Sequence, residues 1–222
     1  MPSLTHFALI LSASLFAATA CNAKANPSMA VPAPTVDAPR ATAPGHETAV
    51  LSGGCFWGVQ AVFQHVKGVI SATSGYAGGS AKTAQYDTVS TGETGHAESV
   101  EIVYDPSQIT YGQLLRIFFS VAHDPTELNR QGPDDGTQYR SAIWYTNDEQ
   151  KKVADSYIAQ LDQEKVFPHR IVTQVAPLKA FYPAEAYHQN YAALHPDNPY
   201  IVFNDAPKVV HLKQEFPDIY RK

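Results

Sequence analysis

The chain has 222 residues and 44% of them are hydrophobic, so it is long enough to bury a core and fits one domain with extensions. Its formal net charge of -5 and the lack of a basic run argue against nucleic acid or an anionic membrane surface as a partner. The only cysteines are Cys21 and Cys55, which excludes a framework of several disulfides.

Residues 1–20 are predicted to be a signal peptide. The stretch from residue 7 to 20 is apolar or small, and Ala18-Thr19-Ala20 fits a cleavage site. It is shorter than the roughly 20 apolar residues of a membrane-spanning helix. Cys21 follows at the position of a lipidated cysteine, although Ala18 departs from the bulky aliphatic residue usual in lipoprotein signals. We therefore expect export, either to the periplasm or with a lipid on Cys21 as the only membrane anchor.

Residues 21–46 are rich in alanine and proline and show no apolar periodicity. This composition predicts a semi-extended tether rather than a domain. The catalytic domain is expected over residues 47–222.

Within this domain, strand-like and helix-like segments alternate. Strands are predicted over 48–51, 69–76, 96–104, 138–145 and 171–175. A helix follows the first strand and ends near Lys67-Gly68, and two more begin at the capping boxes Thr110-x-x-Gln113 and Thr146-x-x-Glu149. Residues 184–194 and 209–216 are also predicted to be helical. This pattern favours an α+β sandwich with a mixed or mostly antiparallel sheet covered by helices.

Cys55 is the most informative residue, because it lies at the turn between the first strand and the first helix. Unpaired amide groups and the helix dipole at such a turn favour an anion, which predicts a reactive thiolate. The neighbouring Gly53 and Gly54 allow a tight turn. The alternative is a small buried hydrophobic residue, the usual role of a free cysteine.

Glu98 is the second candidate, because it shares a strand face with the apolar Val100 and Ile102. A carboxyl group on a buried face has a raised pKa and can donate a proton near neutral pH. The alternative is a carboxylate paired with a neighbouring cation. Tyr86 and Tyr139 could donate their phenolic hydrogens to a substrate oxygen, but half-buried tyrosines are common in folded domains.

Phe56 and Trp57 could wall an apolar pocket beside the sulfur of Cys55, or could simply pack the start of the helix. The nine histidines show no metal-ligand spacing, so no metal site is predicted.

Four motifs of the domain resemble those of the A-class peptide methionine sulfoxide reductases. They are Gly54-Cys55-Phe56-Trp57-Gly58, Gly92-Glu93-Thr94-Gly95-His96-Ala97-Glu98, His123-Asp124-Pro125 and Asp134-Asp135-Gly136-Thr137-Gln138-Tyr139-Arg140-Ser141. The resemblance runs from about residue 49 to 191. It implies a two-layer α/β sandwich and the reduction of methionine-S-sulfoxide, free or in oxidised proteins.

The resemblance also implies a role for each site residue. Cys55 is the implied nucleophile and Glu98 the acid that protonates the sulfoxide oxygen, with Tyr86 and Tyr139 as further donors to that oxygen. Phe56 and Trp57 are the implied methyl pocket. Asp134 is the implied buried organiser of a water and amide network.

Many members of this family carry further cysteines near the C-terminus that resolve the sulfenic acid, and this chain has none there. No bound cofactor is expected, and recycling needs an external thiol such as thioredoxin, glutaredoxin with glutathione, or dithiothreitol. Cys21 is the only internal alternative, because a coil of 34 residues (55 − 21) reaches about 30 Å. We expect a monomer. The competing interpretations are a papain-like cysteine hydrolase and a non-enzymatic thiol redox sensor.

Overall fold

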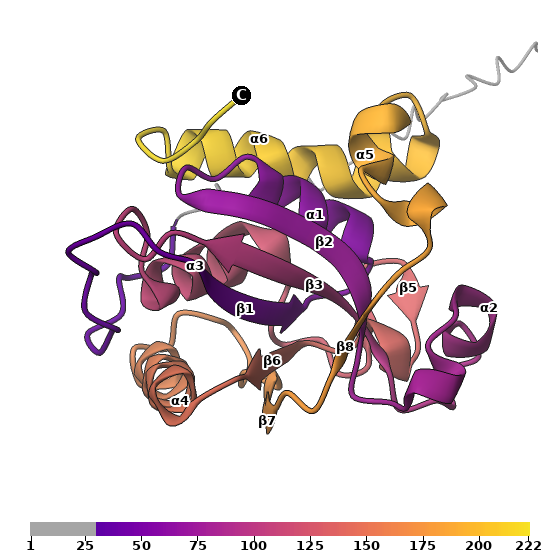
Figure 1. Ribbon diagram of the computed structural model, residues 1–222, viewed down its shortest axis with the longest axis horizontal. Coiled ribbons are helices and arrows are strands. Elements are labelled where there is room, and N and C mark those ends of the chain that lie inside the picture. Colours follow the sequence, from indigo (N-terminus) through magenta and orange to yellow (C-terminus); the bar gives the residue numbers. More distant parts are fainter. Residues whose placement is uncertain (1–29) are drawn as a thin grey trace, which may run out of the picture.

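The computed structural model describes residues 30–222, so the predictions for residues 1–20 and for Cys21 lie outside the described residues. Figure 1 shows a curved sheet with helices packed against it. The strands are β1 (Glu47–Ser52), β2 (Val69–Ala77), β3 (Ala97–Tyr104), β4 (Arg130–Gln131), β5 (Asp134–Asp135), β6 (Ala142–Tyr145), β7 (Gln174–Pro177) and β8 (Phe181–Pro183). The α-helices are α1 (Phe56–Gln64), α2 (Tyr86–Val89), α3 (Tyr111–Ile117), α4 (Asp148–Gln163), α5 (Tyr191–Leu194) and α6 (Ala206–Glu215).

The main sheet of the described residues has the order β7-β6-β1-β3-β2-β8. Neighbouring strands are antiparallel, except that β6 and β7 are parallel. The predicted mixed, mostly antiparallel sheet is confirmed. β1 and β3 lie side by side at its centre, and the chain turns from the end of β1 directly into α1.

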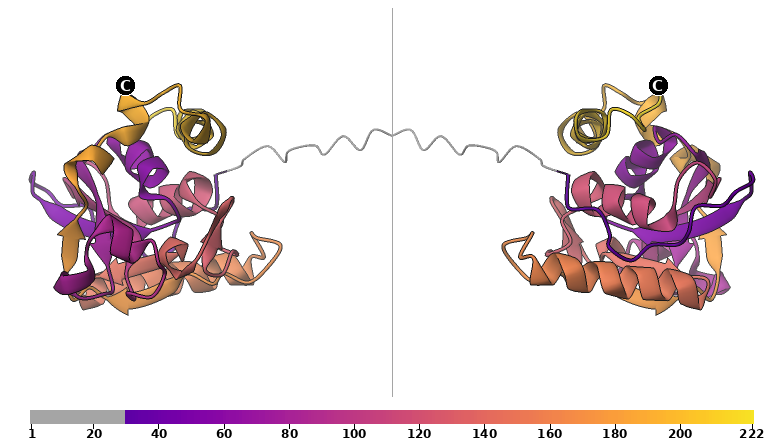
Figure 2. Two further views of the ribbon diagram at one scale, coloured as in Figure 1. Left: turned by 90° about the vertical axis from the view of Figure 1, so that its right-hand side faces the viewer. Right: turned by 90° about the vertical axis from the view of Figure 1, so that its left-hand side faces the viewer.

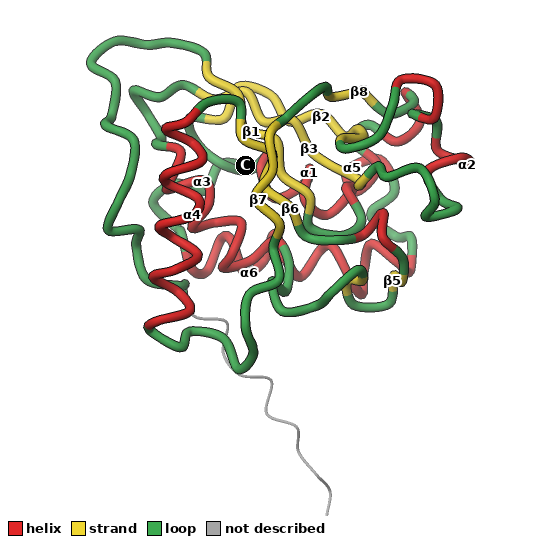
Figure 3. Tube along the Cα trace, turned by 90° about the horizontal axis from the view of Figure 1, so that it is seen from below, coloured by secondary structure: helices red, strands yellow, loops and turns green. Residues whose placement is uncertain are grey.

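The helices bury the apolar face of this sheet. α1 packs on β2 and β3, and α6 packs on α1. Figure 2 shows α4 and α6 at opposite ends of the molecule, and Figure 3 shows α3, α4 and α6 gathered below and to the left of the strands. The core between them contains fully buried aromatic side chains such as Phe56, Phe63 and Tyr104. No helix among residues 30–222 is long and apolar enough to cross a membrane.

Two helix starts test the predicted capping boxes. At α3 the box is present, since Thr110 accepts from the amide of Gln113 and the Gln113 side chain accepts from the amide of Thr110. At α4 the prediction was wrong by one residue, because Asn147 is the N-cap and accepts from the amide of Gln150. Thr146 instead donates its hydroxyl to the Gln150 side chain.

Three other predicted segments are shorter than expected. The strand predicted over 138–145 is limited to β6, because residues 137–139 form a 3₁₀ turn after Gly136, whose φ is 135°. The strand predicted over 171–175 begins only at Gln174. The helix predicted over 184–194 is broken at Asn190, whose φ of 58° is left-handed, into a 3₁₀ turn and the short α5.

Residues 30–46 belong to the segment that was predicted to be a semi-extended tether. The segment is extended, as its prolines require, but it is fixed to the domain. Val31 is 4% exposed, and the Tyr157 hydroxyl donates to the carbonyl of Pro32 at 2.6 Å. Asp37 accepts from the amide of Gly112 at 2.7 Å, at the start of α3. The coil estimate for the reach of Cys21 therefore does not apply to residues 30–46.

Candidate active site

Cys55 is the N-cap residue of α1, at the turn that was predicted. The turn requires glycine at position 54. Its φ is 86°, and a Cβ there would lie 2.5 Å from the side chain of Gln131. The turn therefore presses the backbone against Gln131 and fixes Cys55 at the start of the helix.

Cys55 is 8% exposed, and this burial changes the prediction made for the acidity of its thiol. Burial raises the pKa of the thiol well above its usual value, and the nearby carboxyl groups of Glu98 and Asp205 raise it further. The amide of Trp57 and the ammonium of Lys208 act in the opposite direction but contribute less. The prediction of a thiolate stabilised by the helix start was therefore wrong for the resting site, because burial outweighs the helix amides.

Glu98 lies on β3 and is 3% exposed. Its Oε2 accepts from the amide of Phe56 at 3.0 Å, which ties the carboxyl group to the first turn of α1. Burial raises the pKa of Glu98 to about 8, although the amide of Phe56 lowers it, and the charges of Asp134 and Asp205 raise it further. The raised pKa that was predicted from the strand pattern is present, and Glu98 is mainly protonated at neutral pH.

Two cavities meet at Cys55. The larger cavity has a volume of about 200 Å³ and is lined by Cys55, Phe56, Trp57, Tyr86, Glu98, Asp134, Tyr139 and Tyr200. All seven site residues predicted within the domain thus line one cavity. Tyr200 is an addition that the sequence analysis missed.

Tyr86 and Tyr139 reach this cavity from a short helix and a turn. Tyr86 begins α2, and Glu185 accepts from its amide at 2.9 Å. Tyr139 ends the 3₁₀ turn that follows Gly136. Burial and the nearby Glu98 raise the pKa of both phenols above its ordinary value. Both hydroxyl groups are therefore protonated at neutral pH and can donate a hydrogen bond.

Phe56 and Trp57 are the apolar residues of the cavity lining. They both line the cavity and pack the start of the helix. Phe56 is 1% exposed and belongs to the core, yet it also lines the cavity. The Trp57 ring stacks on Tyr191, with centroids 3.8 Å apart, and its Nε1 donates to His188 at 3.2 Å. These contacts hold the indole in one orientation.

Asp134 lies on β5 and is only partly buried, whereas the family resemblance implied a buried residue. Its carboxylate accepts a short hydrogen bond from the hydroxyl of Tyr200. Burial raises the pKa of Asp134, although the bond from Tyr200 and the charge of Lys208 lower it. Asp134 therefore helps to hold Tyr200 in the wall of the cavity that also contains Cys55.

The smaller cavity has a volume of about 80 Å³. It shares Cys55, Asp134 and Tyr200 with the larger cavity and is otherwise lined by Gln131, Gly132, Pro133, Asn204 and Lys208. Lys208 lies 3.3 Å from the fully buried Asp205. The sequence analysis missed this pair, and the only local signal was Asp205-Ala206-Pro207, a typical helix start.

Among residues 30–222, no histidine is one of the groups that act on the Cys55 thiol. The Nδ1 of His188 accepts from Trp57, and the Nε2 of His123 is bonded to the hydroxyl of Ser141 at 2.8 Å. The charged groups that act on the Cys55 thiol are Glu98, Asp205 and Lys208. This arrangement argues against a papain-like hydrolase, which needs a cysteine paired with a histidine. Within residues 30–222, no group of three or more potential ligands could hold a metal ion.

Comparisons with known proteins agree with the site. A family model described as peptide methionine sulfoxide reductase matches residues 47–219. The peptide methionine sulfoxide reductase MsrA 2 of Mesorhizobium japonicum is 65% identical over 178 residues, which cover 80% of this chain and 91% of that one. The MsrA 2 of Synechocystis sp. is 54% identical over 177 residues, covering 80% and 83%.

Solved structures are similar in the same way. Methionine sulfoxide reductase A of Corynebacterium diphtheriae is 35% identical with a TM-score of 0.60, covering 78% of this chain and 86% of that one. Reduced Mxr1 from Saccharomyces cerevisiae is 33% identical with a TM-score of 0.62, covering 69% and 87%. The chain therefore belongs to the A-class peptide methionine sulfoxide reductases, oxidoreductases that reduce methionine sulfoxide to methionine and repair oxidised proteins.

Proposed function

We propose that Cys55 reduces the S epimer of methionine sulfoxide, free or in proteins, while Glu98, Tyr86 and Tyr139 hold the sulfoxide oxygen. One observation carries this assignment: the only thiol of the described residues and a protonated carboxyl group line the same cavity. A sulfoxide sulfur becomes electrophilic when its oxygen is protonated or strongly hydrogen-bonded. The larger cavity offers three O–H donors for that oxygen and a sulfur nucleophile.

The reaction transfers one oxygen atom and two electrons. The Cys55 sulfur attacks the substrate while Glu98 donates a proton to the sulfoxide oxygen. The substrate S–O bond breaks, a bond forms between the Cys55 sulfur and oxygen, and the thiol proton replaces the proton of Glu98. The products are methionine and a sulfenic acid on Cys55.

The protonation state of Glu98 also controls the thiol. A charged Glu98 raises the pKa of Cys55, so a neutral Glu98 removes one of the two carboxylates that oppose thiolate formation. The amide of Trp57 and the ammonium of Lys208 then act against burial and the remaining charge of Asp205. A protonated Glu98 therefore serves twice, because it can donate to the sulfoxide oxygen and it eases loss of the thiol proton.

The shape of the larger cavity supports selection of one epimer. Phe56 and Trp57 offer an apolar wall for the methyl group, and the oxygen donors come from β3, α2 and the turn at Tyr139. When the methyl group lies at the apolar wall and the oxygen lies at its donors, the remaining substituent on the sulfur must point out of the cavity toward solvent. Only one configuration at sulfur satisfies these three positions, since the sulfoxide sulfur is a stereocentre.

Recycling is assigned to an external thiol, because Cys55 is the only cysteine among residues 30–222. Thioredoxin, glutaredoxin with glutathione, and dithiothreitol are the reductants to compare. We further propose that the enzyme is a monomer that is exported, with Cys21 either free or lipidated. Intact mass of membrane and soluble fractions tests export, and an unprocessed chain as the sole species refutes it.

The decisive experiment is a single turnover without reductant, using the Cys21→Ser variant to remove the second thiol. The S epimer should release one methionine per enzyme, the R epimer none, and dimedone should label Cys55 afterwards. The matched control is Cys55→Ser in the same background, which should release none. Methionine release by that control would refute the assignment of Cys55.

A further inference from the structure

The smaller cavity at Cys55 has no place in the oxygen transfer. It adjoins the sulfur of Cys55 but contains none of the three proposed oxygen donors and neither of the aromatic residues of the methyl wall. Asp134 and Tyr200, joined by their hydrogen bond, line both cavities. Cys55 therefore lines two cavities that differ in all their other residues except Asp134 and Tyr200.

The chemistry of recycling gives the second side a purpose. After oxygen transfer, the oxygen of the sulfenic acid remains among its donors in the larger cavity. A thiolate that displaces this oxygen attacks the Cys55 sulfur roughly in line with the breaking S–O bond. It must therefore arrive from the side of the sulfur that faces away from the oxygen donors.

We propose that the reducing thiol reaches Cys55 through the smaller cavity, so that sulfoxide and reductant use separate entrances. The proposal rests on the proposed function, because it requires a sulfenic acid on Cys55. A water molecule takes up about 30 Å³ of liquid, so about 80 Å³ holds a thiol sulfur and its methylene carbon. The reductant is accordingly a thiol on an unbranched carbon, such as a cysteine side chain, with the rest of the molecule outside.

The lining of the smaller cavity suits this step. Lys208 is the basic side chain in it and is partly exposed, so it offers a cation to the incoming thiolate beside its partner Asp205. Asp134 is the acidic residue that lines the smaller cavity, and its carboxylate already accepts a hydrogen bond from the hydroxyl of Tyr200. The thiolate and the Cys55 sulfur form an S–S bond, the S–O bond breaks, and the oxygen leaves as water with the proton of Glu98. A second thiolate then releases Cys55 and a disulfide of the reductant.

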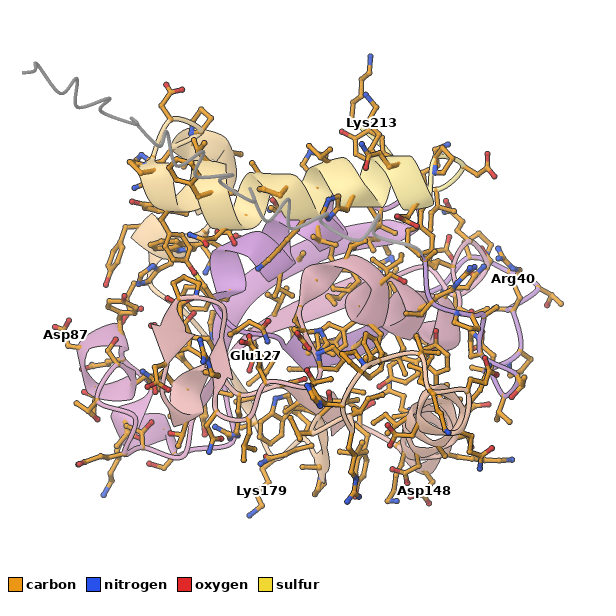
Figure 4. The ribbon with its side chains drawn as sticks, turned by 180° about the vertical axis from the view of Figure 1, so that it is seen from behind. Arg40, Asp87, Glu127, Asp148, Lys179 and Lys213 are labelled. Atoms are coloured by element: carbon orange, nitrogen blue, oxygen red, sulfur yellow. The ribbon has the colours of Figure 1, made fainter. Side chains whose placement is uncertain are left out.

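Gly132 marks the mouth of the smaller cavity. It lies at the turn between β4 and β5, and its amide donates to the carboxylate of Glu127, a residue labelled in Figure 4. A Cβ at Gly132 would meet nothing within 4 Å. Its φ of 55° is one that asparagine tolerates, so Gly132→Asn adds a side chain at the mouth with little strain.

The matched control is Gly95→Asn. Gly95 also has a positive φ, of 76°, and a Cβ there would lie no closer than 3.8 Å to other atoms. It lines neither cavity. Both variants are made in the Cys21→Ser background of the full chain.

The test separates the two half-reactions. Each variant first receives one equivalent of methionine-S-sulfoxide, and released methionine is counted. Glutathione or hydrosulfide is then added, and loss of dimedone-reactive sulfenic acid is timed. For Gly132→Asn we expect unchanged methionine release, a reaction with glutathione at least fivefold slower than in Gly95→Asn, and an unchanged reaction with the much smaller hydrosulfide.

Each other outcome has a distinct meaning. Equal glutathione rates in the two variants would overturn the proposed entrance, as would an equal slowing with glutathione and hydrosulfide in Gly132→Asn. Loss of methionine release in Gly132→Asn alone would also overturn it, because the smaller cavity would then serve the sulfoxide. Absence of methionine release in the parent protein would refute the proposed function instead.

Discussion

Replacing Glu98 by glutamine should make the protein more stable at alkaline pH, and the size of the effect follows from the pKa of Glu98. Its pKa is about 8 in the folded protein against an ordinary 4.5, a difference of 3.5 units. At 1.36 kcal/mol per unit, folding with a charged Glu98 costs up to about 5 kcal/mol. Because the pKa of Glu98 is higher in the folded protein than in the unfolded chain, protonated Glu98 does not oppose folding below pH 4.5. The parent protein loses stability as the pH rises from 4.5 through 8.

The assay is urea unfolding of the parent, Glu98→Gln and Glu101→Gln at pH 5 to 8. The free energy of unfolding of Glu98→Gln relative to the parent should rise by about 3–4 kcal/mol between pH 5 and 8. The reason is that the Glu98 carboxyl group ionises in the unfolded parent over this range, whereas glutamine does not ionise. Glu101 lies on the same strand and is less buried, so Glu101→Gln should change less. A difference independent of pH would show that Glu98 is ionised throughout and cannot be the proton donor. The same variant should slow methionine release in a single turnover by about 10²–10⁴-fold.

Two further substitutions test packing around the site and the N-terminal segment. A Cβ at Gly58 would lie 2.1 Å from Oδ1 of Asp205, so Gly58→Ala should lower the free energy of unfolding by about 1–2 kcal/mol despite the helix preference for alanine. In the Asp205→Ala background the same substitution should cost less. If the losses of the two substitutions simply add in urea unfolding, the contact is contradicted. Asp37→Ala removes a hydrogen-bond acceptor from the start of α3 and should lower the free energy of unfolding by about 1 kcal/mol. The control Asp197→Ala changes an exposed residue and should lower it little. Equal effects of the two substitutions would mean that residues 30–46 do not stabilise the domain.

The first part of the site could be predicted from the sequence because it lies in short contiguous stretches. Cys55, Phe56 and Trp57 follow one another at a strand-to-helix turn, and Glu98 interrupts an apolar strand face. Asp134 was selected only through the family motif, and the motif raised Tyr139 above the other tyrosines, since a tyrosine or aspartate in a polar loop has no strong signal of its own. The mixed sheet followed from strand periodicity, which depends on local burial.

The missed residues share a different property: they reach Cys55 only through tertiary packing. Tyr200, Asp205 and Lys208 lie in the region after residue 191, where the resemblance ended. The π-helical segment Ile201–Asp205 and α6 both pack on α1 and bring them to the site. The N-terminal segment shows the same limit. Its composition predicted an extended chain, but the bonds that fix it come from Tyr157 and Gly112, more than 70 residues away. Backbone φ at Asn190 and Gly136 likewise ended segments that apolar patterning extended.

The acidity of Cys55 shows how a local rule is reversed by its surroundings. Helix-start amides favour a thiolate, and the Trp57 amide does lower the pKa, but burial and two nearby carboxyl groups raise it more. Thiolates react with oxidants faster than thiols, so a protonated, buried Cys55 is protected while no substrate is bound. A sulfoxide brings an oxygen that can take the proton of Glu98, and the thiol proton then replaces it. Reactivity is thus coupled to occupancy of the larger cavity, which suits an enzyme that repairs oxidised proteins.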